Sequence, residues 1–235
     1  MKSPVLLALA LVLAGCGDDV DLPWQLDHDR IIAVRATPPR IASREQARLD
    51  GLLGRAGEPP FEAEPDTAVV VEPTSLSSYL TRRPTGWTVE APGETELANA
   101  RTELGLAADA PVPLRIRVTF PYPANPDRIK TGLKIVWLGE RTENPVLDPI
   151  TIDSIVRTGT DPIVVAPAVD VRLAVVFDDS YVVNWLTSAG TMHDFDLAKA
   201  YLRVEPEDPQ SGTLGVVVRD ELGGVAWRVW PISAE

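Results

Sequence analysis

The pattern of apolar and polar positions changes character along the chain. An apolar run, Val5–Leu13, is followed by small residues and then by the acidic segment Val20–Asp29. Beyond it, short alternating or continuous apolar runs are separated by Pro, Gly and Asp, at intervals of about 8–15 residues. That spacing is typical of an all-β protein, because each run suits one strand of a β-sandwich.

We predict five strands and one helix in the first half. Leu114, Ile116 and Val118 alternate with polar residues, so their strand has one face in a core and one in solvent. Apolar residues between Glu94 and Ala108 recur near helical spacing, which predicts a short helix. The expected strands are Arg30–Ala36, Gln46–Leu53, Thr67–Glu72, Thr85–Glu90 and Val112–Phe120.

The second half offers eight more runs, with the clearest alternation at Asp170–Phe177. An acidic turn after it predicts a hairpin over 170–187, and a glycine-containing turn at 220–224 predicts another between Val216–Val218 and Val225–Val229. The expected strands are Leu133–Leu138, Ile150–Val156, Ile163–Ala166, Asp170–Phe177, Tyr181–Leu186, Ala200–Glu205, Thr213–Asp220 and Val225–Trp230.

Three prolines within Pro121–Arg128 predict a linker between two domains. The expected organisation is therefore a first sandwich over 30–120, a proline-rich linker over 121–129 and a second sandwich over 130–235. A faint internal repeat relates Gln46-Ala47-Arg48-Leu49 to Asp170-Val171-Arg172-Leu173.

The N-terminus has the pattern of an export signal. Lys2 precedes the run Val5–Leu13, which is shorter than the roughly 20 apolar residues that span a bilayer. Leu13-Ala14-Gly15-Cys16 resembles the lipobox of bacterial lipoproteins. The resemblance implies a signal peptide over 1–15, cleavage before Cys16 and attachment of a diacylglyceryl group, with acyl chains such as palmitate, to the Cys16 thiol. Residues 16–29 would then form an acylated tether.

Such an anchor makes the membrane a partner through acyl chains on Cys16, because two or three chains hold a protein stably in a bilayer. An aspartate directly after the cysteine would retain a lipoprotein at the inner membrane in the enteric sorting scheme. Gly17 occupies that position, so the outer membrane is favoured, with periplasmic and surface orientations both open.

Charge and cysteine content exclude other classes. The 235 residues carry a formal charge of −12, which argues against nucleic acid as a partner, because binding a polyanion relies on surplus lysine and arginine. One cysteine cannot form an intramolecular disulfide, so both sandwiches must hold by packing alone.

Two later motifs carry a resemblance to bacterial immunoglobulin-like (Ig-like) and PKD-like domains. One is Trp185 followed by a Ser/Gly-rich stretch, and the other is Val218-Arg219-Asp220 leading to Gly223-Gly224. The opening strands, with Ile32–Ala36, are similar to Ig-like modules of envelope lipoproteins. The resemblance implies two Ig-like β-sandwiches in tandem and no particular activity. Antibody-type domains have a disulfide beside the tryptophan, so Trp185 must pack against aliphatic residues alone.

Few residues suggest catalysis. His28 and His193 are the two histidines, each beside aspartates, and either could serve a metal or an enzyme site. Neither lies in an established ligand motif, so an exposed loop histidine is the simpler interpretation and no catalytic residue is assigned.

Acidic turns and tryptophans leave two ligand classes open. Asp178, Asp179, Asp194 and Asp196 fall in predicted turns and could bind calcium, although a solvated acidic surface explains them equally. Trp230 is the candidate for stacking on a sugar, because Trp227 and Trp230 should face opposite sides of one strand. Core packing of Trp137, Trp185 and Trp227 is the alternative.

These patterns predict a lipid-anchored protein of the bacterial envelope with a structural, adhesive or protein-binding role, and without catalysis or a required cofactor. Its partner would be an envelope protein or a polysaccharide. The alternatives are a carbohydrate-binding module that uses exposed tryptophans and, third, an enzyme with a site at His193 or His28.

Overall fold

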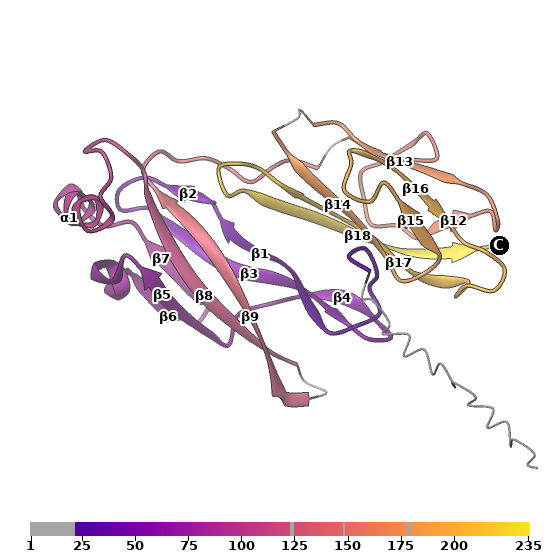
Figure 1. Cartoon of the computed structure of the whole chain (residues 1–235), viewed down its shortest axis with the longest axis horizontal. Coiled ribbons are helices and arrows are strands. Elements are labelled where there is room, and N and C mark those ends of the chain that lie inside the picture. The colour runs from indigo at the N-terminus through magenta and orange to yellow at the C-terminus, as the bar shows by residue number, and fades with distance from the viewer. Residues whose placement is uncertain (1–21, 123–124, 148, 178–179) are drawn as a thin grey trace, which may run out of the picture.

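Two β-sandwiches follow one another along the chain. The computed structural model describes residues 22–122, 125–147, 149–177 and 180–235, and each sandwich has two sheets that enclose apolar side chains (Figure 1). The predicted all-β class with two tandem sandwiches is confirmed. Within these ranges, no helix has the length and apolar character needed to cross a membrane.

The first sandwich pairs a sheet of order β1-β3-β7-β6, in which β4 also pairs with β3, with a sheet of order β2-β9-β8-β5. The strands of the first sheet are β1 (Arg30–Thr37), β3 (Gln46–Arg55), β4 (Glu58–Ala63), β6 (Leu80–Arg83) and β7 (Gly86–Glu90). Those of the second are β2 (Arg40–Ile41), β5 (Thr67–Glu72), β8 (Val112–Tyr122) and β9 (Asn125–Leu138).

Strand β8 shows why the alternating pattern was informative. Leu114, Ile116 and Val118 are fully buried between the sheets, whereas Arg115 and Arg117 point to solvent. Period-two alternation places successive side chains on opposite faces, so half of this strand supplies core and half supplies surface.

The predicted helix forms as α1 (Glu94–Leu104). Glu94 and Glu96 lie in its first turn, where negative charge complements the helix dipole, and Gly105 ends it in the left-handed conformation with a φ of 65°. Leu97 and Ala100 bury the inner side of the helix against the first sandwich. A short 3₁₀ helix, η1 (Thr74–Tyr79), was not predicted.

The second sandwich pairs a sheet of order β11-β10-β13-β16-β15 with one of order β12-β18-β17-β14. The first sheet contains β10 (Ile150–Ile152), β11 (Ile155–Arg157), β13 (Val171–Val175), β15 (Thr191–His193) and β16 (Lys199–Arg203). The second contains β12 (Ile163–Val165), β14 (Val182–Thr187), β17 (Ser211–Arg219) and β18 (Val225–Ala234).

The two sandwiches repeat one topology. The paths β1-β3-β7-β6 and β10-β13-β16-β15 follow the same chain order, as do β2-β9-β8-β5 and β12-β18-β17-β14. In each case the first strand of the second sheet runs parallel to the last strand of the sandwich. This is the arrangement of Ig-like sandwiches. The internal repeat has a structural basis, because its two copies fall on the equivalent strands β3 and β13.

Two predictions about connectivity were wrong. The proline-rich segment is no linker: β8 and β9 form one hairpin, with Pro121 paired to Ile129 near its end, where a missing N–H is tolerated. The predicted strand Leu133–Leu138 therefore belongs to the first sandwich, and the chain crosses to the second after Leu138. A proline-rich segment can lie at the end of a hairpin as well as between two domains, and in this protein it lies at the end of a hairpin.

Residues 170–187 also do not form a hairpin. β13 pairs with β10 and β16, whereas β14 pairs with β17 in the opposite sheet. The apolar alternation correctly identified both strands, but it cannot tell whether consecutive strands lie in one sheet or in two. The other predicted hairpin is confirmed, because β17 and β18 pair along their whole length.

Candidate functional site

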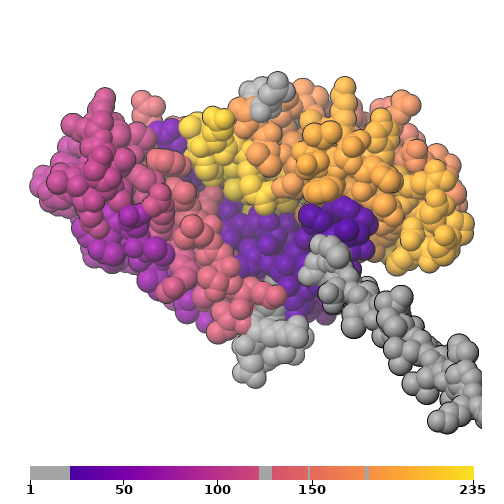
Figure 2. Space-filling view, viewed as in Figure 1, coloured from indigo at the N-terminus to yellow at the C-terminus, as the bar shows by residue number. Residues whose placement is uncertain are grey.

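The two sandwiches meet along an apolar junction. Side chains of β1 and β3 pack against side chains of β14, β17 and β18, so a sheet of one sandwich contacts a sheet of the other (Figures 1 and 2). The buried members of this cluster are Leu26, Ala33, Leu52, Leu186, Val217 and Val225. Burial of apolar surface stabilises the contact and fixes the two sandwiches relative to each other.

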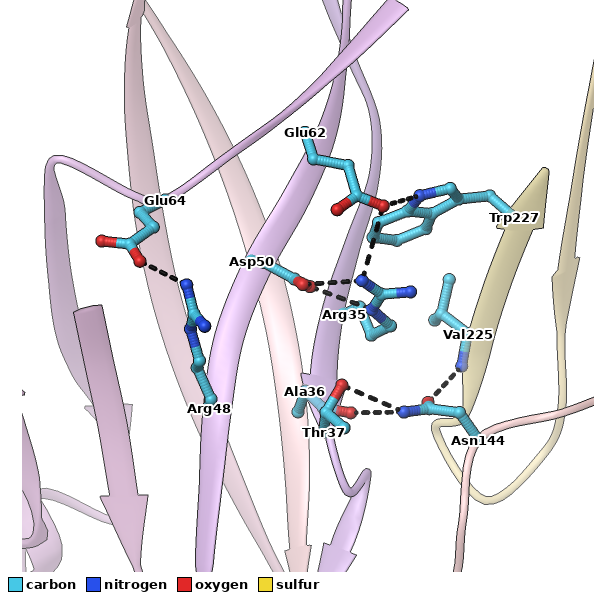
Figure 3. Close-up of polar contacts among 10 residues, drawn as sticks. All are labelled: Arg35, Ala36, Thr37, Arg48, Asp50, Glu62, Glu64, Asn144, Val225 and Trp227. Atoms are coloured by element: carbon cyan, nitrogen blue, oxygen red, sulfur yellow. Dashed lines mark hydrogen bonds and ion pairs between the residues drawn. The ribbon is translucent and has the colours of Figure 1, made fainter. Parts of the chain in front are cut away.

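A polar cluster lies beside this apolar core (Figure 3). Arg35 of β1 donates two hydrogen bonds to Asp50 of β3, from Nε at 3.1 Å and from Nη2 at 2.7 Å. The guanidinium also lies over the Trp227 ring of β18, 3.9 Å from its centroid. The Trp227 indole N–H donates to Glu62 of β4 at 2.7 Å. Charge-assisted and cation–π contacts therefore join the sandwiches.

Asn144 adds a second link, from the segment that connects the sandwiches. Its amide nitrogen donates to the carbonyl of Ala36 at 2.9 Å, and its amide oxygen accepts from the Val225 N–H at 2.8 Å. One side chain thus hydrogen-bonds the backbones of both sandwiches.

A third link buries a lysine. Lys134 lies on β9 opposite Ile116 of the core, is only 5% exposed, and donates from Nζ to the carbonyl of Gly223 at 2.5 Å. Gly223, at the turn between β17 and β18, has a φ of 85°, which favours glycine. Burial lowers the pKa of Lys134 to about 8, and attraction to Asp220 opposes that shift.

A cavity of about 430 Å³ opens at this position, lined by Lys134 and Arg219 among others. Arg219 donates to the side chain of Asn184 at 2.6 Å and to the carbonyl of Ile32 at 2.9 Å, and burial lowers its pKa. Lys134 and Arg219 each donate a hydrogen bond to a backbone carbonyl of the opposite sandwich, so both cations hold the junction together.

The segment expected to be a tether is docked instead. The Thr187 N–H donates to the carbonyl of Trp24 and the Leu26 N–H donates to the carbonyl of Thr187, both at 2.9 Å. Trp24 packs in the core of the second sandwich and Leu26 in the junction. The tether prediction was therefore wrong for residues 22–26, because their two large apolar side chains are buried.

The histidines lie apart from one another. His28 is hydrogen-bonded through Nδ1 to its neighbour Asp27 at 2.8 Å, and His193 is exposed at the end of β15. Asp194 and Asp196 follow it and are exposed, whereas Asp178 and Asp179, like Cys16, lie outside the described residues. Within the described ranges, no three His, Cys, Asp or Glu residues gather in a way that could hold a metal ion.

The tryptophans do not form an exposed platform. Trp185 is fully buried, as predicted, and its indole donates to the carbonyl of Leu197 at 3.1 Å. Trp230 is also fully buried and donates to Gly159 at 2.7 Å, so its candidacy for sugar stacking was wrong. Trp137 and Trp227 are only half-buried, because both lie at the junction rather than inside a sandwich core.

Sequence reasoning missed the residues that join the sandwiches. Arg35, Asp50 and Asn144 carry no motif, since their contacts are set by tertiary packing. Lys134 did leave a signal: it occupies an inward position of the alternation that continues through Val136 and Leu138. A lysine in a core register indicates a buried partner.

The outer face of the sheet β2-β9-β8-β5 presents a different set of side chains. Val69, Arg117 and Leu133 form one row across β5, β8 and β9. Val69 is 48% exposed and Leu133 61% exposed. Within the described residues no carboxylate pairs with Arg117, whereas Arg115 pairs with Glu72.

No family model and no curated protein matches the chain. Among solved structures, the chain is similar to the two tandem V-type regions of a v-region-containing chitin binding protein, with 8% identity over 86% of this chain and 99% of that one, at a TM-score of 0.35. It is also similar to the N-terminal Ig1-2 module of the Drosophila receptor protein tyrosine phosphatase DLAR, with 9% identity over 88% and 99% and a TM-score of 0.29.

A nucleoside hydrolase-related hypothetical protein from Saccharophagus degradans matches 40% of this chain at 14% identity and a TM-score of 0.32, and the chain spans about a quarter of that protein. Likeness at these scores carries no argument about function. The Ig-like class rests on the strand order itself, and the molecule is defined by it as two tandem Ig-like sandwiches joined through a packed junction.

Proposed function

We propose that this protein is a lipid-anchored, non-catalytic component of the bacterial cell envelope, which presents a protein-binding surface on a rigid pair of Ig-like sandwiches. The lipobox Leu13-Ala14-Gly15-Cys16 supports the anchor, and Gly17 after it supports the outer membrane. The rigid junction supports a presenting role, because a binding face on a fixed scaffold loses little entropy when it binds.

The observation that carries the binding role is the row Val69, Arg117 and Leu133. Among the described residues no carboxylate pairs with the Arg117 guanidinium, which lies between two exposed aliphatic side chains on the outer face of the sheet. Arginine beside apolar contacts is enriched at the centres of protein interfaces. The partner would be a protein that supplies a carboxylate to Arg117 and apolar side chains to Val69 and Leu133.

Charge favours this face over the rest of the molecule. Residues 30–138 carry 14 basic and 13 acidic side chains, whereas residues 139–235 carry 7 basic and 16 acidic ones. An acidic partner would therefore be repelled by the second sandwich and accepted by the first. Electrostatic complementarity of this kind directs which surfaces meet.

Cross-linking in native membranes tests the binding role. The Arg117→Glu variant should lose the cross-linked adduct formed by the wild-type protein, while Arg172→Glu, a charge reversal on the exposed face of the second sandwich, should retain it. An adduct that survives Arg117→Glu, or that disappears equally in both variants, would exclude this face as the binding surface.

Metabolic labelling with a fatty-acid analogue tests the anchor separately. The wild-type protein should take up label and fractionate with outer membranes, and Cys16→Ser should take up none. Label on the Cys16→Ser protein would refute acylation at this residue, whatever the outcome of cross-linking.

A further inference from the structure

The docked N-terminal segment fixes the point at which any anchor pulls on the body. Residues 24–26 extend the edge of β14 through two backbone hydrogen bonds with Thr187. Arg30, the first residue of β1, donates from Nη1 to the carbonyl of Pro23 at 2.8 Å. With Trp24 and Leu26 buried, Leu22 is held beside the domain junction by contacts from both sandwiches.

We propose that the two-sandwich body lies side-on to the lipid surface, held at its domain junction and with Ile129 of β9 turned toward the bilayer. This inference rests on the proposed acylation of Cys16. The partner is a phospholipid surface.

The reach of the free chain is the first constraint. Six residue steps separate Cys16 from Leu22, and an extended chain advances at most about 3.3–3.6 Å per residue, so they span no more than about 22 Å. Without docking, the free chain would extend to Arg30 and reach at most about 50 Å. The docked segment therefore keeps the junction close to the lipid surface.

That reach excludes a molecule standing on the α1 end of the first sandwich. β1 runs from Arg30 to Thr37, a rise of about 23 Å at 3.3 Å per residue. Thr37 of β1 pairs with Arg48 of β3, and Gln46 of β3 pairs with Glu90 of β7. Helix α1 begins after Glu90, so it lies still farther from Arg30 along the same direction. In Figure 1, α1 lies at the far end of the molecule from the second sandwich. Standing on this end would lift Leu22 beyond its reach.

Charge disfavours the opposite orientation, with the second sandwich pointing into the lipid. Its side chains carry a net charge of −9, against +1 on the first sandwich. Anionic phospholipids repel the acidic sandwich within about one Debye length of the surface, roughly 8–10 Å at physiological salt. Lowering the nearly neutral first sandwich toward the surface carries no such penalty.

The side-on orientation satisfies both constraints. In Figure 1 the β8–β9 hairpin extends below the rest of the body and the indigo segment that starts at Leu22 lies in the lower half, whereas β13 lies along the upper edge. Near the hairpin end, Ile129 is 63% exposed and Lys130 follows it. An apolar and a cationic side chain together suit the boundary between headgroups and acyl chains.

Single-cysteine fluorescence quenching tests the orientation. Because acylation would consume the thiol of Cys16, each engineered cysteine is the only free thiol of the lipidated protein. Dyes at Ala56→Cys near the junction, Ile129→Cys near the hairpin end, Ala98→Cys on α1 and Glu235→Cys at the C-terminus would be compared. The probe is a vesicle of phosphatidylethanolamine and phosphatidylglycerol with a headgroup-bound quencher.

We expect several-fold stronger quenching at Ala56→Cys and Ile129→Cys than at Ala98→Cys and Glu235→Cys. Stronger quenching at Glu235→Cys than at Ile129→Cys would overturn the proposal in favour of the second sandwich pointing down, and strongest quenching at Ala98→Cys would overturn it as well. Equal quenching at all four sites would mean a body without fixed orientation and would also overturn it.

A flexible spacer provides the matched control. About 20 Gly/Ser residues inserted between Asp19 and Val20 lengthen the free chain without touching a described residue, and should reduce the difference among the four sites at least severalfold. Failure of the proposed function is distinguishable, because an unacylated wild-type protein would not attach to the vesicles and would give no quenching at any site.

Discussion

The two sandwiches share one strand order and differ in nearly everything added to it. The first carries α1, η1, the β3–β4 extension and a long β8–β9 hairpin, and is close to neutral. The second has shorter strands on one sheet, a strongly acidic composition and two fully buried tryptophans. A common topology therefore tolerates different core chemistry and different additions around it.

The cores should differ most in their sensitivity to truncation. Trp185 lies on β14, and the equivalent strand of the first sandwich, β5, contributes the smaller Val70 to its core. Trp185→Ala should lower the free energy of unfolding by about 3–5 kcal/mol, and Val70→Ala by about 2 kcal/mol. Urea denaturation followed by circular dichroism measures both, and equal losses would contradict a second sandwich centred on one large aromatic.

The junction should give the protein a pH dependence that neither core has. The pKa of Lys134 is about 8 in the folded protein, below the ordinary value of 10.5, because burial disfavours the charged form. Asp220 and Asp50 attract this ammonium and Arg219 repels it. The unfolded chain binds more protons in that window, so stability should rise with pH there, by up to about 3 kcal/mol.

Lys134→Met should remove this rise, because methionine has no proton to bind. The quantity to measure is the difference in the free energy of unfolding between pH 8 and pH 10.5 for wild type and variant. Lys199→Met, at an exposed position of β16, is the control and should leave the wild-type slope unchanged. A slope unaffected by Lys134→Met would show that the lysine is solvated.

A smaller effect is expected at the segment between the sandwiches. Asn144→Ala removes the hydrogen bonds to Ala36 and Val225 and should cost about 1–2 kcal/mol. Because the loss weakens coupling more than either core, calorimetry should show the single unfolding transition broaden toward two. Asn99→Ala on the exposed side of α1 is the matched control, and a sharp wild-type-like transition in Asn144→Ala would argue that the apolar contacts alone couple the sandwiches.

The sequence was most informative where local patterning decides structure. All five strands predicted in the first half are present, and α1 ends at the glycine expected to end it, since alternation, capping and turn residues act over a few positions. Pairing was harder to predict, because the alternation at Val171–Val175 specifies a buried face without specifying which strand lies beside it.

Local sequence patterns could not predict the contacts of the junction, and the reason is physical. Arg219 and Ile32 are 187 residues apart, and Trp227 and Glu62 are 165 apart, so no window of sequence contains both members of either contact. The docked N-terminal segment was missed because Val20–Asp29 is acidic overall, and its burial depends on two residues, Trp24 and Leu26, that a composition-based interpretation averages away.

Docking of residues 24–26 on β14 also bears on how the protein is made. Residues 24–26 are synthesised long before Thr187, the residue that hydrogen-bonds them. The edge of the second sandwich is therefore completed by the oldest part of the nascent chain, a contact of very high contact order that forms late. Until the second sandwich has formed, the core in which Trp24 packs does not exist.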